Sequence, residues 1–231
     1  MLDEAKLVAD RYSQRLPAGD DPRYNMLNPA MWLIVQERQR VLLRMLDRYL
    51  HKPLNMTNLL EIGCGAGGNL LDLIRIGFNP ENLFANELLP ERVALARKNL
   101  PSSCPILEGD ALAVDFKSKS FDIIYQSMVF TSLLDFQYRQ ELAHKMWQLL
   151  HPDGSILWYD FVYNNPSNKN VRGVSLRQVK LLFPEGIIKY KRLTLAPPIA
   201  RIAVKLHPLM YHCLNTFPFL RSHVMCWITK K

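Results

Sequence analysis

The sequence predicts an α/β fold built on a doubly wound, mostly parallel sheet. Strand-like and helix-like segments alternate between residues 58 and 160, and a glycine-rich turn follows the first strand. The strands are continuously apolar, as expected where helices cover both faces of a sheet. The chain has 231 residues, 48% of them hydrophobic, which suits one domain and excludes a disordered chain.

Residues 29–50 predict an amphipathic helix before the first strand. The segment opens with Pro29, which suits a first helical turn. Apolar residues then recur at helical spacing: Leu33, Val41, Leu42, Met45, Leu46 and Tyr49. Since residues 1–50 contain no strand-like segment that could join the sheet, we expect them to form a helical lid. A static helical arm packed on the domain is the alternative.

Residues 51–160 contain the alternating pattern and are the predicted core of the domain. The expected strands are 58–62, 83–86, 106–108, 121–125 and 155–159, and the helices are 69–76, 90–100 and 136–150. Gly77 closes the first of these helices, and Pro90 begins the second.

The alternation breaks after residue 160. We expect a helix over 171–182, a strand over 187–195, an irregular proline-punctuated segment and a last strand over 224–229. Residues 199–220 are rather apolar, but Arg201 and Lys205 interrupt them, so they do not predict a membrane-spanning helix. We interpret residues 161–231 as an acceptor-binding part of the same domain.

The charge is distributed unevenly. Residues 161–231 hold twelve lysines and arginines against one acid, Glu185, which gives a net charge of +11; residues 1–160 carry −3. Such asymmetry indicates that the C-terminal part faces something anionic: a phosphorylated small molecule, a membrane surface or a nucleic acid.

The four cysteines are scattered, and none forms a C-x-x-C pair. This spacing argues against a zinc site or a disulfide framework and fits reduced thiols. The first fifteen residues alternate charged and apolar side chains and lack the apolar core of a signal peptide. We therefore expect a soluble cytoplasmic protein.

The clearest functional signal is the sequence LLEIGCGAGGN at residues 59–69. An apolar strand and an acid, Glu61, lead into Gly63-x-Gly65-x-Gly67 at the start of a helix. Glycines at such a turn allow a tight bend and let the backbone approach a ligand closely. The pattern is typical of a nucleotide-type cofactor site because a strand precedes it and a helix follows it.

The spacing distinguishes two cofactor classes, because dinucleotide sites use G-x-G-x-x-G. The E-x-G-x-G-x-G found here resembles motif I of class I S-adenosylmethionine-dependent methyltransferases. Glu87 lies 20 residues beyond Gly67, where a carboxylate can accept both ribose hydroxyls. Residues 109–111, 121–125 and 149–155 resemble later motifs of that family. The resemblance implies these S-adenosylmethionine-binding residues: Glu61, Gly63, Cys64, Gly65, Gly67, Asn69, Glu87, Leu88, Asp110, Ala111 and Gln126.

The resemblance also implies a Rossmann-like seven-stranded sheet in the order 3-2-1-4-5-7-6, with the last strand antiparallel. Ligands bind outside the carboxyl ends of parallel strands. Residues after the fifth strand and at the start of the last strand should therefore share one active edge. These are Asp160, Tyr163 and Asn164, and then Arg221 and His223.

His223 is the first candidate for the base that removes the acceptor's proton, since an unperturbed imidazole titrates near ~6.5. Asp160 is the second candidate. Structural roles, including a salt bridge from Asp160 to Arg172, are the alternatives. Expected substrate-binding residues are Tyr163, Asn164, Arg172 and Arg221. Metal-dependent relatives have an acid after the fourth strand and Asp-Asn after the fifth, so Gln126 and Asp160-Phe161 predict no metal.

The acceptor is inferred by elimination. The segment after the fourth strand, from Gln126 to Val129, lacks the motifs of nucleic-acid methyltransferases, and the double-glutamate loop of protein arginine methyltransferases is absent. A small, anionic molecule is therefore expected, and no nucleic acid. The C-terminal third resembles methyltransferases found with bacterial surface-polysaccharide and secondary-metabolite genes, which favours a hydroxyl of a sugar or phosphate-bearing glycan intermediate. The alternatives are a lipidic quinone or isoprenoid acceptor, with peripheral membrane contact, and a non-catalytic cofactor-binding scaffold.

Overall fold

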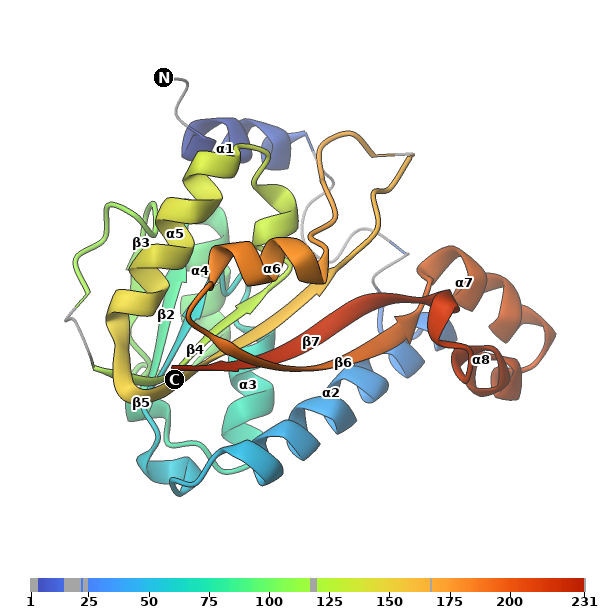
Figure 1. Cartoon of the computed structure of the whole chain (residues 1–231), viewed down its shortest axis with the longest axis horizontal. Helices are drawn as coiled ribbons and strands as arrows, with labels where there is room; N and C mark the ends of the chain where they lie inside the picture. The colour runs from blue at the N-terminus through green and yellow to red at the C-terminus, as the bar shows by residue number, and fades with distance from the viewer. Residues whose placement is uncertain (1–3, 15–21, 23–24, 117–119, 167, 231) are drawn as a thin grey trace.

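The computed structural model describes residues 4–14, 22, 25–116, 120–166 and 168–230. Its centre is a seven-stranded sheet in the order β3-β2-β1-β4-β5-β7-β6 (Figure 1). Neighbouring strands from β3 to β5 are parallel, whereas β7 runs antiparallel to both β5 and β6. The strands are β1 (Leu59–Ile62), β2 (Leu83–Glu87), β3 (Ile106–Glu108), β4 (Phe121–Ser127), β5 (Leu150–Phe161), β6 (Ile187–Leu195) and β7 (Arg221–Thr229). The predicted fold class and strand order are confirmed.

Helices cover both faces of the sheet (Figure 1). The α-helices are α1 (Glu4–Ser13), α2 (Pro29–Tyr49), α3 (Gly68–Arg75), α4 (Pro90–Asn99), α5 (Phe136–Leu149), α6 (Leu176–Leu182), α7 (Pro197–Leu206) and α8 (Pro208–Asn215). Residues from α2, α3 and α4 share a core cluster on one face, and residues from α5 and α6 pack on the other. None of these described helices is both long enough and apolar enough to span a membrane.

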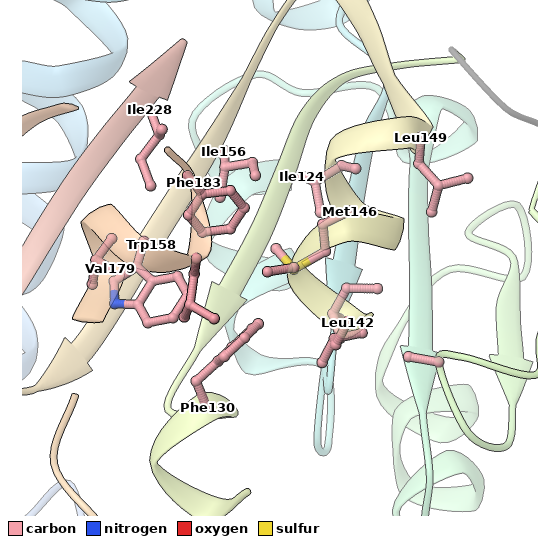
Figure 2. Close-up of a cluster of buried hydrophobic side chains, with 14 of the residues drawn as sticks. Ile124, Phe130, Leu142, Met146, Leu149, Ile156, Trp158, Val179, Phe183 and Ile228 are labelled. Carbon is pink, nitrogen blue, oxygen red and sulfur yellow. The ribbon is translucent and has the colours of Figure 1, made fainter. Parts of the chain in front are cut away.

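The core beneath α5 and α6 is built from alternate residues of the central strands (Figure 2). Trp158 of β5 lies between the rings of Phe130 and Phe183, with centroids 4.5 and 6.1 Å away. The remaining labelled side chains of this core are Ile124, Leu142, Met146, Leu149, Ile156, Val179 and Ile228. Because side chains alternate across a strand, the intervening residues of β4 and β5 face α2 and α3.

Helix α2 belongs to the core of the domain. The side chain of Asn28 caps its first turn by accepting from the Ala30 N–H at 3.1 Å, and Pro29 occupies the first helical position. Its later turns pack in the cluster that holds β1, β4 and β5, and its first turns pack on α7 and α8. The lid was expected to span residues 1–50, but α2 is therefore part of the core instead.

The C-terminal third is more regular than we expected. The proline-punctuated segment was predicted to be irregular, and this is wrong: it forms α7 and α8, which each begin at a proline. A proline in the first turn loses no helical hydrogen bond, so these prolines start helices. The helix expected from residue 171 begins at Leu176, because Ser175 and Gln178 form a capping box.

Candidate active site

The glycine-rich loop after β1 holds three glycines with positive φ, at 68° for Gly63, 58° for Gly65 and 85° for Gly67. A Cβ at Gly63 would lie 2.6 Å from Cγ2 of Val129, whereas a Cβ at Gly65 would meet nothing within 4 Å. The loop is thus packed tightly on one side and open on the other. Gly67 is the N-cap of α3 and does not line the cavity described next.

A cavity of about 280 Å³ lies where β1, β2 and β4 end. Side chains from the loops after these strands line it, together with Val8 and Tyr12 of α1 and Tyr138 of α5. Eight of the eleven predicted cofactor residues are in its wall: Gly63, Cys64, Gly65, Asn69, Glu87, Leu88, Asp110 and Ala111. Their convergence on one cavity follows from the topology, which brings the carboxyl ends of parallel strands to one edge.

Glu87 fixes the glycine-rich loop to the end of β2. One carboxylate oxygen accepts from the Gly65 N–H at 2.7 Å, and the other accepts from the Leu89 N–H at 3.0 Å. The residue is buried and lines the cavity. A carboxylate oxygen can accept more than one hydrogen bond, so Glu87 retains capacity for hydroxyl donors of a ligand.

Glu61 lies behind the cavity wall. Its Oε1 accepts from Nδ2 of Asn69 at 2.6 Å, while its Oε2 is buried and without a hydrogen-bond partner among the described residues. Burial raises the pKa of Glu61 to about 8, against the opposing effects of Asn69 and Arg38. An unsatisfied buried carboxylate oxygen is costly, which indicates that a polar or cationic group belongs next to it.

Asp110, after β3, is held from two sides. Its Oδ1 accepts from the Leu112 N–H at 2.9 Å and forms a short hydrogen bond with the hydroxyl of Tyr138. Tyr138 stands in the first turn of α5, and no local sequence signal linked it to Asp110. Asn86 donates to the carbonyl oxygens of Leu107 and Gly109 at 3.1 and 2.9 Å, which fixes this loop beside β2.

The end of β4 is strained where it meets the cavity. Met128 lines the cavity with a φ of 65°, an uncommon value for a residue other than glycine. Gln126, which we expected to contact the cofactor, is fully buried outside the cavity wall. Its Oε1 accepts from the Val129 N–H at 3.1 Å, so its position fits a support for this turn.

Comparison with known proteins shows which family this part of the chain is similar to. The family model described as a methyltransferase domain matches residues 60–158, which run from β1 to β5 and include every residue of the cavity wall except Val8 and Tyr12. Over this stretch the chain is similar to the methyltransferase-domain family, and its overall fold is that of solved S-adenosylmethionine-dependent methyltransferases.

Two curated relatives are methyltransferases whose names refer to lipidic compounds. The chain is 28% identical to a demethylmenaquinone methyltransferase of Deinococcus radiodurans over 151 residues, covering 64% of this chain and 59% of that protein. It is 26% identical to a sterol 4-C-methyltransferase of Caenorhabditis elegans, covering 48% of this chain and 33% of that protein. The chain thus spans less than two thirds of either relative.

A solved structure with the same fold spans nearly the whole chain. The geranyl diphosphate C-methyltransferase of Streptomyces coelicolor superposes with a TM-score of 0.68 at 12% identity, covering 99% of this chain and 98% of that one. The agreement extends over the elements outside residues 60–158, including the N-terminal helices and β6 and β7.

His223 lies on the expected edge, where it pairs with Phe161 across β5 and β7. Its environment, however, does not fit the general base that we expected. The ring is buried and stacks on Tyr159 with centroids 5.2 Å apart. Burial, with a smaller contribution from Arg38, lowers its pKa to about 3, far below the ~6.5 of an unperturbed imidazole. His223 is also absent from the cavity wall.

Asp160 is buried behind the cavity instead of facing it. Its Oδ1 accepts from the Thr131 hydroxyl at 2.5 Å, and its Oδ2 accepts from the Thr131 N–H at 3.3 Å. Burial raises its pKa to about 7. These contacts hold the short 3₁₀ helix η4 (Phe130–Ser132), whose last residue lines the cavity. Its geometry fits a positioning residue better than a base, and it bonds to Thr131 instead of forming the salt bridge to Arg172 that was the structural alternative.

The four expected substrate residues lie near the ends of β5 and β6, outside the cavity wall. The Tyr163 hydroxyl accepts from Arg192 at 2.7 Å, and the Asn164 side chain accepts from the Gly173 N–H at 3.1 Å. Arg221 donates to the Asn215 carbonyl oxygen at 2.8 Å and so caps the end of α8. Arg172 is exposed, and its N–H donates to the Thr131 carbonyl oxygen at 2.8 Å. Direct substrate contact remains a prediction for these residues.

Helix α1 covers the cavity and supplies two of its lining side chains, Val8 and Tyr12. Glu4 accepts from the Leu134 N–H at 2.7 Å, and Arg11 donates to the Ser132 carbonyl oxygen at 3.0 Å. The guanidinium of Arg92 lies over the Tyr12 ring, 4.4 Å from its centroid. These contacts tie α1 to the cavity wall through polar groups. Residues 15–21 and 23–24 of the expected lid lie outside the described residues.

We expect cofactor to protect α1 from proteolysis. Because α1 is held mainly by side chains that line or border the cavity, filling the cavity should favour its docked position. Limited digestion should cut before residue 29 in the free protein and slow at least severalfold with S-adenosylhomocysteine bound. Tyr12→Ala should reduce the protection, while Lys52→Ala, on the loop after α2, should not. Equal cleavage with and without the ligand would contradict the lid.

Proposed function

We propose that this chain transfers the methyl group of S-adenosylmethionine to a small-molecule acceptor. The observation that carries the proposal is the cavity at the ends of β1, β2 and β4, where Glu87 holds the open glycine-rich loop. When bound, the cofactor supplies an electrophilic methyl group on its sulfonium. The protein's task is then to bind the cofactor, align the acceptor and exclude water.

The residues of the site fit this cofactor in three places. The unfilled space beside Gly65 admits a ligand against the backbone. The carboxylate of Glu87 is suited to the ribose hydroxyls, and Asp110 and Ala111 border the space for the adenine. The unpartnered oxygen of Glu61 is suited to the ammonium group of the amino-acid end, with Asn69 between Glu61 and the cavity.

The proposed role of Glu61 predicts proton release on cofactor binding. With a pKa of about 8, Glu61 is mostly protonated at pH 7 in the free protein, and a nearby ammonium would favour its carboxylate. We expect release of about one proton per bound cofactor at pH 7, declining as the pH rises through 8 and above. Calorimetry in buffers of different ionisation enthalpy measures this directly.

Glu61→Gln should abolish the proton release. Glu108→Gln is the matched control, because Glu108 is a partly exposed acid on β3 outside the cavity wall. The control should release protons as the unmodified protein does. Unchanged proton release in Glu61→Gln would assign the titration to another group.

The composition of the cavity wall is relevant to the chemical class of the acceptor. Apart from the cofactor residues it is largely apolar, with Leu89, Val129, Leu133 and Leu142, and Arg92 is the cation among its described residues. The basic residues beyond residue 160 that the structure describes lie elsewhere. A phosphate-bearing glycan, our first expectation, is supported by the +11 charge of that segment. A lipidic quinone or isoprenoid is supported by the apolar wall and by the names of the relatives.

We favour the lipidic acceptor. The apolar side chains of the cavity wall would align the ring of a quinone or the chain of an isoprenoid next to the transferred methyl group. This alignment would not require the basic residues beyond residue 160. The intact glycine-rich loop and Glu87 argue against the third expectation, a non-catalytic scaffold. Alignment rather than a strong base carries the proposed reaction, since His223 and Asp160 are both buried outside the cavity wall.

The test is transfer of labelled methyl groups from S-adenosylmethionine to two panels of acceptors. One panel contains isoprenoid quinones and prenyl diphosphates in detergent micelles, and the other contains nucleotide sugars. Labelling confined to the first panel is the expected result. Labelling of a nucleotide sugar would restore the glycan assignment, and cofactor binding without any labelling would favour the scaffold.

A further inference from the structure

Helices α7 and α8 form a lobe at the end of the molecule that carries the edge strand β6 (Figure 1). Large apolar side chains on this lobe are unusually exposed: Ile202 is 66% accessible, Leu206 75%, Leu209 61% and Phe219 68%. Single exposed apolar residues are ordinary on protein surfaces, but a concentration of them indicates an interaction site.

The exposed side of α7 carries large apolar residues as well as basic ones. Its small residues Ala200 and Ala203 are buried against the first turns of α2. Its large residues Ile202 and Leu206, one turn apart, lie on the opposite, exposed side. Polar residues normally occupy that side, so the exposed face of α7 is suited to an apolar environment.

Exposed apolar residues also lie around the start of α2, which borders α7. A groove between α2 and α7 is lined by Asn28 and Pro29 on one side and by Arg201, Ile202 and Lys205 on the other. Immediately beside Asn28, Leu27 is 90% accessible, and Trp32 in the next turn is 50% accessible. Tryptophan is enriched where proteins meet the boundary between lipid and water.

The charged side chains that line the groove, among the described residues, are both positive. Arg201 and Lys205 stand one turn apart on α7 and line the groove, and the sequence contains no acid after Glu185. Long basic side chains can keep their charge at a polar boundary while their stems pack on apolar surface. Apolar residues flanked by lysine and arginine are the pattern of helices that lie in the interface of an anionic bilayer.

We propose that Leu27, Trp32, Ile202, Leu206, Leu209 and Phe219, here called the lobe surface, dock this protein on an anionic phospholipid bilayer. A second copy of the chain is a poorer occupant. A symmetric contact through the lobe surface would bring Arg201 and Lys205 of both copies together, with no acid of the same segment to pair with them. The inference deepens the proposed lipidic acceptor, which would be drawn from the same bilayer.

Vesicle flotation tests the lobe surface without measuring methyl transfer. The full chain is mixed with vesicles of phosphatidylcholine alone, or of phosphatidylcholine with phosphatidylglycerol. We expect flotation with the anionic vesicles and little with the neutral ones. The double variant Ile202→Ser with Leu206→Ser should lower partitioning at least about tenfold, because two exposed apolar side chains no longer enter the interface. Arg201→Gln with Lys205→Gln should lower it by about tenfold or more and weaken its dependence on salt.

The control variant is Leu181→Ser, which removes an apolar side chain that is 58% accessible on α6, outside the lobe. It should float as the unmodified protein does. Absence of flotation, or flotation that neither double variant reduces, would overturn the proposal. So would a concentration-dependent dimer in sedimentation that Ile202→Ser with Leu206→Ser dissociates, since the occupant would then be a second copy.

Cofactor affinity measured on the same variants separates this inference from the proposed function. Both double variants should bind S-adenosylhomocysteine as tightly as the unmodified protein, which also confirms that they fold. Loss of flotation with intact cofactor binding supports the lobe surface. A chain that floats but transfers no methyl group would contradict the proposed function alone.

Discussion

Gly65→Val is expected to abolish most cofactor binding while leaving the fold intact. Gly65 has a φ of 58°, and left-handed backbone costs residues with a Cβ ~1–2 kcal/mol, more for a β-branched one. No neighbouring atom lies within 4 Å of the position of a Cβ, so the side chain would fit in the free protein by entering the cavity. It would thus occupy space that the cofactor needs.

We expect calorimetry to show at least about a hundredfold weaker binding of S-adenosylhomocysteine, because the strain and the lost space both oppose it. The matched control is Gly68→Ala. Gly68 begins α3, and a Cβ there also meets nothing within 4 Å. It should bind cofactor normally. Wild-type affinity in Gly65→Val, with an unchanged thermal transition, would place the cofactor elsewhere.

Glu87→Ala is expected to weaken cofactor binding by ~1.5–3 kcal/mol, about 10- to 150-fold, if charge-assisted bonds to the ribose are lost. The variant also leaves the N–H groups of Gly65 and Leu89 without their present acceptors. Part of the loss of cofactor affinity should therefore come from a less ordered glycine-rich loop. A lower unfolding temperature of the variant would reveal this contribution.

Two comparisons separate these contributions. Glu87→Gln keeps the shape and one acceptor oxygen, but its amide nitrogen cannot accept from either backbone N–H, so an intermediate affinity is expected. Glu108→Ala removes the acid paired with Glu87 in the register of β2 and β3, outside the cavity wall, and should leave affinity unchanged. Undiminished affinity in Glu87→Ala would rule out the ribose contact.

Local pattern explains why the elements and the glycine-rich loop could be predicted from the sequence. A strand such as Leu59–Ile62 is marked by its apolar run, and α2 by its helical spacing from Leu33 to Tyr49. Gly63, Gly65 and Gly67 adopt positive φ because glycine has no Cβ. The presence of glycine is read directly from the sequence. The strand order needed more than local pattern, and it followed from the resemblance to a known family.

Local patterns predicted the wrong structure where proline can either interrupt a helix or begin one. Prolines in the segment after β6 indicated irregular structure, yet at first helical positions they begin α7 and α8. Which role a proline takes depends on whether the following residues find a surface to pack on. For α7 that surface is the start of α2, more than 160 residues earlier in the sequence.

The sequence by itself determined the α/β elements and the glycine-rich loop, because those properties depend on neighbours within a few positions. The family resemblance added eight residues of the cavity wall. Only the tertiary structure decided the state of the titratable groups. His223 is neutral because β7 is buried beside Tyr159 and near Arg38 of α2, and Asp160 holds η4 because Thr131 lies against it. The pKa of a group depends on its burial and on charges brought by distant segments, and neither can be read from the residues beside it in the chain.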